Sequence, residues 1–111
     1  MVFYLAGNAT TDLDGDGFPD QGLICAFSDP TFTSWGCYGT DLLDVPNVAF
    51  NGGNPVGLGA EIGDGKFNTD KMLSNCSTAS AASLVLDVFG SDWFLPSIKE
   101  LNQIYLNKAT L

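Results

Sequence analysis

The feature that most constrains the fold of this chain is a long stretch, from Ser28 to about Gly65, with few signals for regular structure. It is rich in glycine, asparagine and proline, and NGGNPVGLG (51–59) consists almost entirely of turn-forming residues. Loops of this length are uncommon in small domains and often carry function.

Short runs of β-branched and aromatic residues predict strands at three places. VFYL (2–5) and GLICAF (22–27) precede the long stretch, and turn-forming residues bound both runs. WFL (93–95) lies near the end of the chain and reads as a short buried strand. The aspartate-rich stretch between the first two runs therefore lies on the loop that joins two strands.

Two helices are predicted between the long stretch and WFL. Asn68 caps a short helix that runs to about Asn75. A second helix is predicted over 78–89, and Gly90 ends it. Apolar residues spaced at i, i+3, i+4 and i+7 give the second helix its inward face: Ala81, Leu84, Val85 and Val88.

A third helix is predicted after Pro96. Ser97 followed by Glu100 has the spacing of a capping box, and Glu100 is otherwise expected at the helix surface, as is Lys99. Three apolar residues form the expected inward face: Ile98, Leu101 and Tyr105. The order of elements predicts one α+β domain over 1–111, with two to three helices and long loops.

The charge of the chain excludes several functions. The net charge is −9, with four lysines, no arginine and no histidine. A chain with so few cations cannot build the basic patch that binds nucleic acid. The absence of histidine excludes Ser-His-Asp and Cys-His catalytic sites within the chain. No apolar run approaches the roughly 20 residues of a membrane-spanning helix, so we expect no membrane insertion.

The chain has three cysteines, so at most one disulfide can form within it. Cys25 lies in an apolar run and reads as an inert buried thiol. Cys37 and Cys76 lie in loop-like contexts and are the better candidates for a pair, although spacing alone does not decide the connectivity. No CxxC pair is present, which argues against zinc and thioredoxin-like chemistry.

Three segments of the chain resemble one bacterial family. SDWFLPSIKELNQIY (91–105) resembles the signature of the Lcl C-terminal domain, named after a collagen-like adhesin. SWGCYGT (34–40) and IGDGKFNTDKML (62–73) look like two further segments of this family, and VFYL is similar to its opening strand. Together they span most of the chain.

The resemblance implies a C-type-lectin-like fold, with a small, twisted antiparallel sheet, two helices and long surface loops. This fold is similar to that of formylglycine-generating enzymes. It also implies a bacterial cell-surface or secreted setting, in which some members act as adhesins. We therefore expect a non-catalytic module that presents long loops to a glycan or protein ligand. The alternative is a structural subunit or tip domain of an extracellular assembly or phage fibre.

Family members usually continue after the last helix with a WSS-type segment and final strands, whereas this chain stops at Leu111. Three explanations stay open: a fragment, a shortened variant, or strands supplied by another chain. A sheet that lacks those strands would expose an edge. The exposed edge or the odd cysteine could then support self-association.

DLDGDGFPD (12–20) is a further departure from the family, whose members more often have a plain turn there. Four acids occupy positions 1, 3, 5 and 9 of a calcium-type loop, a glycine occupies position 6 and a carbonyl position 7. The bidentate acid of an EF-hand is absent, since Leu23 takes its position. The pattern predicts calcium ligands at Asp12, Asp14, Asp16, the Phe18 carbonyl and Asp20; the alternative is an acidic turn that binds nothing.

Trp35 and Tyr38, which flank Cys37, are the candidate ligand-binding aromatics. Exposed, they could stack on a sugar ring; the alternative is that they cover the core, as large aromatics generally do. Asp64 and Asp70 are explained by turn and cap roles. Because the chain is acidic, we expect neutral sugars or a protein rather than sulfated glycans as the ligand.

Overall fold

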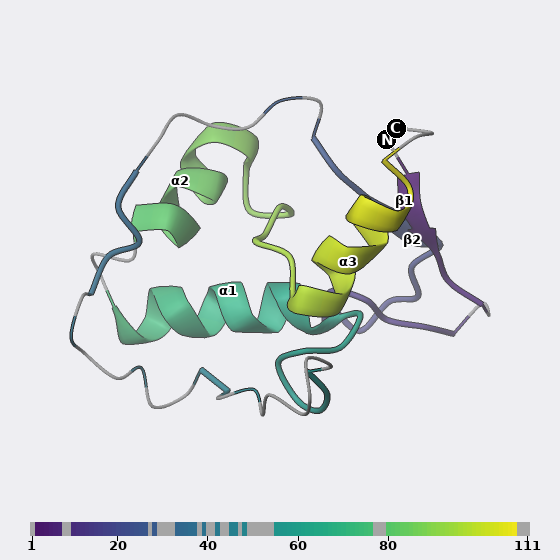
Figure 1. Ribbon diagram of the computed structural model, residues 1–111, viewed down its shortest axis with the longest axis horizontal. Coiled ribbons are helices and arrows are strands. Elements are labelled where there is room, and N and C mark those ends of the chain that lie inside the picture. Colours follow the sequence, from purple (N-terminus) through teal and green to yellow (C-terminus); the bar gives the residue numbers. More distant parts are fainter. Residues whose placement is uncertain are drawn as a thin grey trace.

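The computed structural model describes residues 2–7, 10–26, 28, 33–37, 39, 42, 45–46, 48, 55–76 and 80–108. Two strands come first along the chain, β1 (Val2–Leu5) and β2 (Gly22–Ile24). Three helices follow: α1 (Asp64–Asn75), α2 (Ser80–Phe89) and α3 (Ile98–Leu106). The predicted α+β class is confirmed, and the strands lie beside α3 while α1 and α2 pack together (Figure 1).

The two strands form an antiparallel pair, with Tyr4 opposite Leu23 and an irregularity between Val2 and Tyr4. The two strands approach closely at Gly22, where any added Cβ atom would clash with the Tyr4 carbonyl oxygen. The second strand was predicted over 22–27, but it ends at Ile24, which lies opposite Val2, the first residue of β1. Phe27 lies outside the described residues.

Helix α1 begins earlier than predicted. Its N-cap is Gly63, whose φ of 99° is left-handed and therefore suits glycine. The Asp64 carboxylate accepts hydrogen bonds from the N–H groups of Gly59 and Glu61, at 2.8 and 3.0 Å. Asn68, the predicted cap, lies inside the helix and donates to the Gly59 carbonyl. The helix starts at Asp64 because the preceding turn folds back onto its carboxylate.

Helix α2 ends as predicted, at Gly90 with a φ of 104°. Its buried side is only partly the predicted one, since Val85 is 8% exposed but Val88 is 53% exposed. Ala82 is 1% exposed and lies against the buried Cys76. The small Ala82 side chain lets this side of α2 approach the end of α1, which leaves Val88 outward.

Helix α3 has the predicted capping box. The Ser97 Oγ accepts from the Glu100 N–H at 3.2 Å, and Glu100 Oε1 accepts from the Ser97 N–H at 2.7 Å. The predicted inward face is wrong, because its three members are 46–62% exposed: Ile98, Leu101 and Tyr105. Glu100, expected at the surface, is fully buried instead.

The segment before α3 forms no strand in the described part of the chain. In a sheet the Leu95 N–H would donate to a carbonyl of a neighbouring strand. Here it donates to the Thr69 hydroxyl of α1 at 3.0 Å. Trp93 packs against the ring of Phe89, with the ring centroids 5.3 Å apart. The prediction of a buried strand therefore fails, because a buried helix side chain takes the place of a strand partner.

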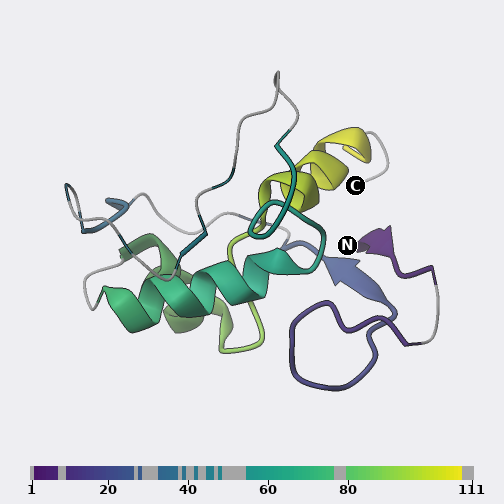
Figure 2. The ribbon, with the colours of Figure 1, turned by 90° about the horizontal axis from the view of Figure 1, so that it is seen from below.

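Two small apolar clusters lie on either side of this segment. Phe3, Leu13 and Leu23 centre the first cluster, and Phe94 packs against it. Cys76 and Ala82 centre the second cluster, beside Leu95. The 12–20 loop between the strands forms an open ring at the edge of the molecule (Figure 2). None of the described helices is long and apolar enough to cross a membrane.

Candidate metal site and ligand cavity

The ends of the 12–20 loop are fastened together and to the core. The Asp20 N–H donates to the Thr11 carbonyl at 2.7 Å, and Asp20 Oδ2 accepts from the Leu13 N–H at 2.7 Å. The Leu13 side chain is 3% exposed and belongs to the first apolar cluster. The buried Leu13 side chain therefore holds the start of the loop against the core, and the hydrogen bonds of Asp20 hold its end against its start.

Within the loop, the backbone curves around the Asp12 carboxylate, which accepts hydrogen bonds from backbone N–H groups. Its Oδ1 accepts from the Gly15 N–H at 2.8 Å and its Oδ2 from the Gly17 N–H at 2.9 Å. Both glycines have left-handed φ values, 79° and 87°, which side chains rarely adopt. Asp14 and Asp16 each accept from the N–H two residues further on.

Three carboxylates converge in this loop. Asp12, Asp14 and Asp20 each offer an oxygen, and these oxygens all lie within 4.8 Å of one another. Calcium binds oxygens at 2.3–2.6 Å, so opposite ligands of one ion are about 5 Å apart. The three oxygens fit one such shell. The Asp16 carboxylate lies outside this group, and Phe18, whose backbone carbonyl is the predicted ligand, is 71% exposed.

The electrostatics of the group differ from residue to residue. Partial burial raises the pKa of Asp14 above its ordinary value; the Asp16 N–H opposes this, and the charges of Asp20 and Asp16 add to the rise. Hydrogen bonds from backbone N–H groups, above all that of Gly17, lower the pKa of Asp12. A cation held among these carboxylates would relieve the repulsion that Asp14 experiences.

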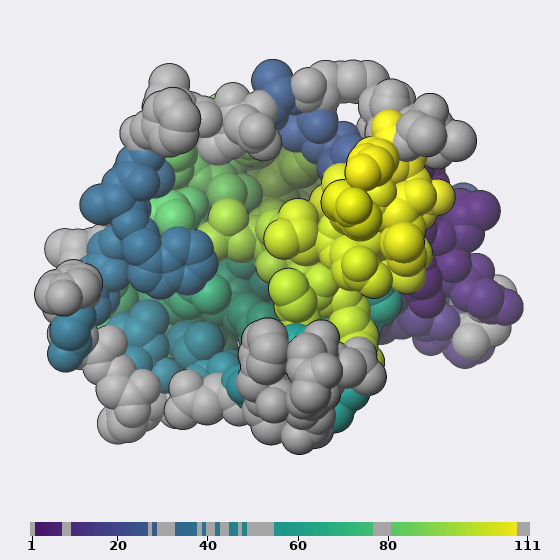
Figure 3. Space-filling model, in the orientation of Figure 1, coloured from purple at the N-terminus to yellow at the C-terminus, as the bar shows by residue number. Residues whose placement is uncertain are grey.

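A cavity of about 510 Å³ lies beside this loop. Its walls are mostly apolar and come from β2, the end of α2, the 93–96 segment and α3. Figure 3 shows one face of the molecule, with yellow-green atoms between the green atoms of α2 and the yellow atoms of α3. The volume of the cavity falls within the range of small-ligand sites, roughly 300–1,000 Å³.

The cavity and the carboxylate group share two residues. Asp14 and Asp20 belong to both, and Asp92 is a third carboxylate in the lining. Sequence reasoning missed Asp92, which precedes the 93–96 segment in SDW. Asp92 could have been predicted from its position directly before WFL, because these apolar residues are expected to be at least partly buried.

Trp35 and the disulfide lie away from the cavity, whereas Cys25 is part of its lining. Trp35 is 62% exposed, so the interpretation that it covers the core is wrong, and it does not line the cavity. Tyr38 lies outside the described residues. A disulfide joins Cys37 to Cys76, with the Cα atoms 6.3 Å apart. Cys25 is half-buried against the first apolar cluster.

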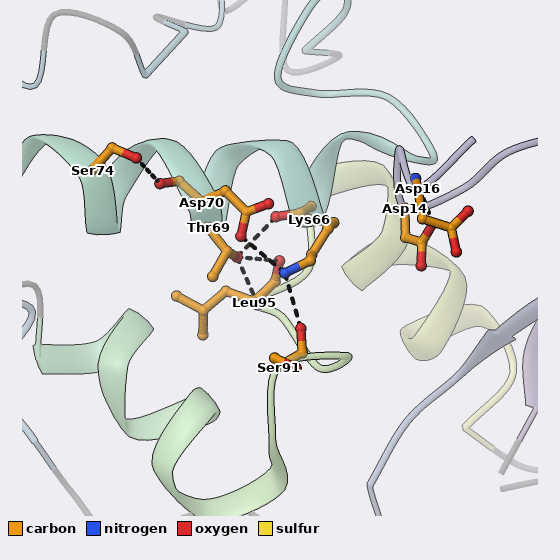
Figure 4. A network of polar contacts seen from close by, with 9 residues as sticks. Asp14, Asp16, Lys66, Thr69, Asp70, Ser74, Ser91 and Leu95 are labelled. Carbon is orange, nitrogen blue, oxygen red and sulfur yellow. Dashed lines mark hydrogen bonds and ion pairs between the residues drawn. The ribbon is translucent and has the colours of Figure 1, made fainter. Parts of the chain in front are cut away.

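The remaining charged candidates have structural partners. Lys66 donates to the Asp70 carboxylate at 2.9 Å and to the Ser91 carbonyl at 3.0 Å, which ties α1 to the turn before α3 (Figure 4). Lys99, placed at the helix surface by the sequence, donates to Glu61 at 2.6 Å. These contacts hold the helices together and leave the Asp-rich loop as the candidate metal site.

No protein-family model, curated protein or solved structure matches this chain. The resemblance to the Lcl C-terminal domain therefore stays a prediction from the motifs, as does the C-type-lectin-like fold.

Proposed function

We propose that this protein is a non-catalytic binding module of the bacterial cell surface or extracellular space, with an Asp-rich loop that calcium stabilises. The observation that carries this proposal is the apolar cavity beside the carboxylate group, with Asp14 and Asp20 common to both. A calcium ion there orders one wall of the ligand site. The ligand is a glycan or a protein on another surface.

The disulfide supports an extracellular setting. Disulfides form and persist mainly in oxidising compartments. The bond between Cys37 and Cys76 closes a large loop, since the sequence separation of the two cysteines is 39. Calcium loops with few protein ligands belong to the weak, extracellular range of affinity, roughly 10⁻⁴ to 10⁻³ M. Both features suit a protein exposed to millimolar calcium.

In the proposed site, the carboxylates of Asp12, Asp14 and Asp20 bind the ion. The loop spacing also predicts Asp16 and the Phe18 carbonyl as ligands, but the Asp16 carboxylate lies outside the group of three converging carboxylates. The ion acts as a structural cation that offsets the repulsion among the acids. The chain's own hydrogen bonds, above all those to Asp12, hold the loop near the required curvature.

The lining of the cavity supports a ligand other than a sulfated glycan. Its carboxylates and the net charge of −9 repel polyanions. The exposed Trp35 offers a stacking surface for a neutral sugar, and Tyr38, the second predicted aromatic, lies outside the described residues. The non-catalytic reading draws support from the absence of histidine and from the capping role of the buried Glu100.

A thermal melt in EDTA and in calcium tests the metal part of this function. At about 10 mM calcium, an affinity in the extracellular range adds about 1.5–3 kcal/mol, a rise of several degrees. The variant Asp14→Asn should lose this rise and melt no lower than wild type in EDTA, because a repelling charge is gone. Asp87→Asn, on the exposed surface of α2, should keep it. An equal melting temperature of wild type in both buffers would contradict the calcium site.

One observation favours the structural-subunit alternative. Large apolar side chains are exposed on β1 and α3: Leu5 is 72% exposed, Tyr105 62% and Leu106 63%. Such groups on a small domain mark a surface that another chain covers. Light scattering over a range of concentrations, with and without reductant, separates this function from that of a monomeric binding module. A monomer throughout would contradict the alternative.

A further inference from the structure

The cavity lies between the core-facing side of the sheet and the end of α2. Its walls include Phe3 of β1, Leu23 of β2 and Leu13 of the Asp-rich loop, the three buried members of the first apolar cluster. Val85 and Phe89 of α2 contribute to the lining as well. Helix α2 packs mainly against α1, and the strands pack against α3, so none of the described helices fills the space between α2 and the sheet (Figure 1).

An apolar space of this size is unusual beside the core of a small domain. Protein interiors are close-packed, and voids larger than a water molecule are few. Apolar cavities take up apolar molecules rather than water, and this one has a volume of about 510 Å³. A sugar ring has its stacking surface at Trp35, outside the lining. The cavity itself therefore suits a small molecule with an apolar body.

The charged groups at the cavity favour a positive ligand. None of the chain's four lysines is in the lining, whereas Asp92 is, together with the two aspartates of the proposed calcium site. Neither of the ion pairs among the described residues includes Asp92. Lys66, which donates to the neighbouring Ser91 carbonyl, pairs with Asp70 instead. Asp92 thus brings to the cavity a negative charge that the proposed calcium site does not use.

Aromatic side chains accompany this carboxylate in the lining. Trp93 follows Asp92 directly, and its ring packs against that of Phe89 with the centroids 5.3 Å apart. Aromatic rings attract cations over their faces, and tryptophan does so most strongly. A ligand with a cationic group therefore finds a carboxylate and two aromatic rings in the same part of the chain, next to the apolar walls.

We propose that the cavity binds a small molecule with an apolar body and an ammonium group. The body fills the space between α2 and the sheet, and the ammonium group pairs with Asp92 next to Trp93. This goes beyond the proposed function, because it gives the cavity a small ligand that binds with or without calcium. Anionic molecules of the same size are repelled by the carboxylates of the lining and by the net charge of −9.

Fluorescence titration of the full chain tests this proposal. Trp35→Phe, at an exposed position outside the lining, leaves Trp93 as the only tryptophan, since the chain has two. Octylammonium, octanol and octanoate are the matched probes: a cation, a neutral molecule and an anion with the same chain. We expect one octylammonium per protein, bound about twofold to fivefold more tightly than octanol, with octanoate the weakest. Octanoate that binds as tightly as octylammonium overturns the charge selection.

The length of the apolar chain tests whether the cavity takes up the body of the ligand. Burial of one methylene group tightens binding by about threefold to fourfold. Hexylammonium should therefore bind roughly tenfold more weakly than octylammonium, and butylammonium roughly tenfold more weakly again. Equal affinities along this series, or several molecules bound per protein, mean adsorption at the surface and overturn the proposal.

Two pairs of variants place the binding at this cavity. In Asp92→Asn, octylammonium should lose its preference over octanol, whereas Asp87→Asn, outside the lining, should keep it. Leu101→Gln should weaken both probes about threefold, and Leu106→Gln should weaken neither. These four side chains are exposed, so each variant should fold. A preference that survives in Asp92→Asn, or equal binding by the two leucine variants, overturns the assignment.

The same titrations in EDTA and in calcium, at constant ionic strength, separate this inference from the metal site. Octylammonium that binds equally in both buffers, without a calcium-dependent rise in melting temperature, supports the inference and contradicts the metal site. Calcium stabilisation without octylammonium binding has the opposite meaning. Octylammonium that calcium displaces occupies the Asp14 and Asp20 carboxylates, and this overturns the assignment to Asp92.

Discussion

The Glu100 carboxylate in α3 accepts a hydrogen bond from the Gly63 N–H at the start of α1, 2.9 Å away and 37 residues earlier in the sequence. The same carboxylate caps its own helix through the Ser97 N–H. One buried side chain thus satisfies backbone donors at the beginning of two helices. Anionic groups are stabilised at helix N-termini, and here one anion serves both.

Removing this carboxylate should separate the two helix ends. Glu100→Ala leaves the Ser97 and Gly63 N–H groups without their acceptor in a buried place, at a cost of about 3 kcal/mol in the free energy of unfolding. Glu100→Gln keeps one oxygen acceptor and should cost less than the alanine variant. Urea unfolding measures both, and an alanine variant as stable as wild type would show that water replaces the carboxylate.

The pH dependence of stability should carry the signature of Glu100. Burial raises its pKa above the ordinary value of 4.5, against the hydrogen bonds that lower it. The folded state therefore holds this proton more tightly than the unfolded chain. The resulting stabilisation is fully present below pH 4.5 and is lost as the pH rises through the folded-state pKa. Unfolding curves of wild type and Glu100→Gln should thus diverge across this window, and parallel pH profiles would contradict the assignment.

Gly65 should tolerate no side chain. An added Cβ atom would lie 2.7 Å from the Leu95 carbonyl oxygen, 2.9 Å from Cδ2 of Phe94, and against the Glu100 carboxylate. Alanine is the better helix former by about 1 kcal/mol, but this close packing reverses the preference. We expect Gly65→Ala to lose about 1–3 kcal/mol. Gly7→Ala is the matched control, because nothing lies within 4 Å of its Cβ position. Equal melting temperatures of the two variants would contradict the packing.

The Cys37–Cys76 disulfide should contribute strongly to stability. The sequence separation of 39 residues corresponds to about 4 kcal/mol of loop entropy in the unfolded chain. Reductant should therefore lower the melting temperature of wild type and leave a double Cys37→Ser, Cys76→Ser variant unchanged. Reductant should still lower the melting temperature of Cys25→Ser, because that variant keeps the disulfide. A reductant effect that survives in the double variant would assign the sensitivity to another group.

The pKa of Glu61 should report its pairing with Lys99. The hydrogen bond from Lys99 chiefly lowers this pKa, with help from the Gly57 N–H. The depressed pKa gives stability that is present above pH 4.5 and is lost as the pH falls through the folded-state value. In Lys99→Met the Glu61 pKa should rise toward its ordinary value. Titration by carboxyl chemical shifts measures this, and an unchanged pKa would mean that Gly57 alone is responsible.

Local patterns in the sequence predicted the elements whose ends depend on local chemistry. Ser97 and Glu100 lie three residues apart and cap their helix without help from distant residues. Gly90 ends α2 for the same local reason, and the first strand has its expected bounds. The acids in the 12–20 loop also interact mainly with near neighbours, so their clustering could be anticipated from spacing.

The predictions that failed depend on partners far apart in the sequence. The orientation of α3 follows from Gly63, which draws the Glu100 carboxylate inward and turns Leu101 outward. The 93–95 segment donates to the Thr69 hydroxyl instead of a strand. Apolar periodicity alone cannot reveal a polar side chain that is buried because a distant backbone N–H needs an acceptor.

The disulfide also has a topological consequence for the long segment between the strands and the helices. Cys37 and Cys76 close a covalent ring that contains all of α1. Proteolysis at a single peptide bond between the two cysteines opens this ring without dividing the molecule. The two fragments stay joined and separate only after reduction, so a nicked protein retains its full mass on a non-reducing gel.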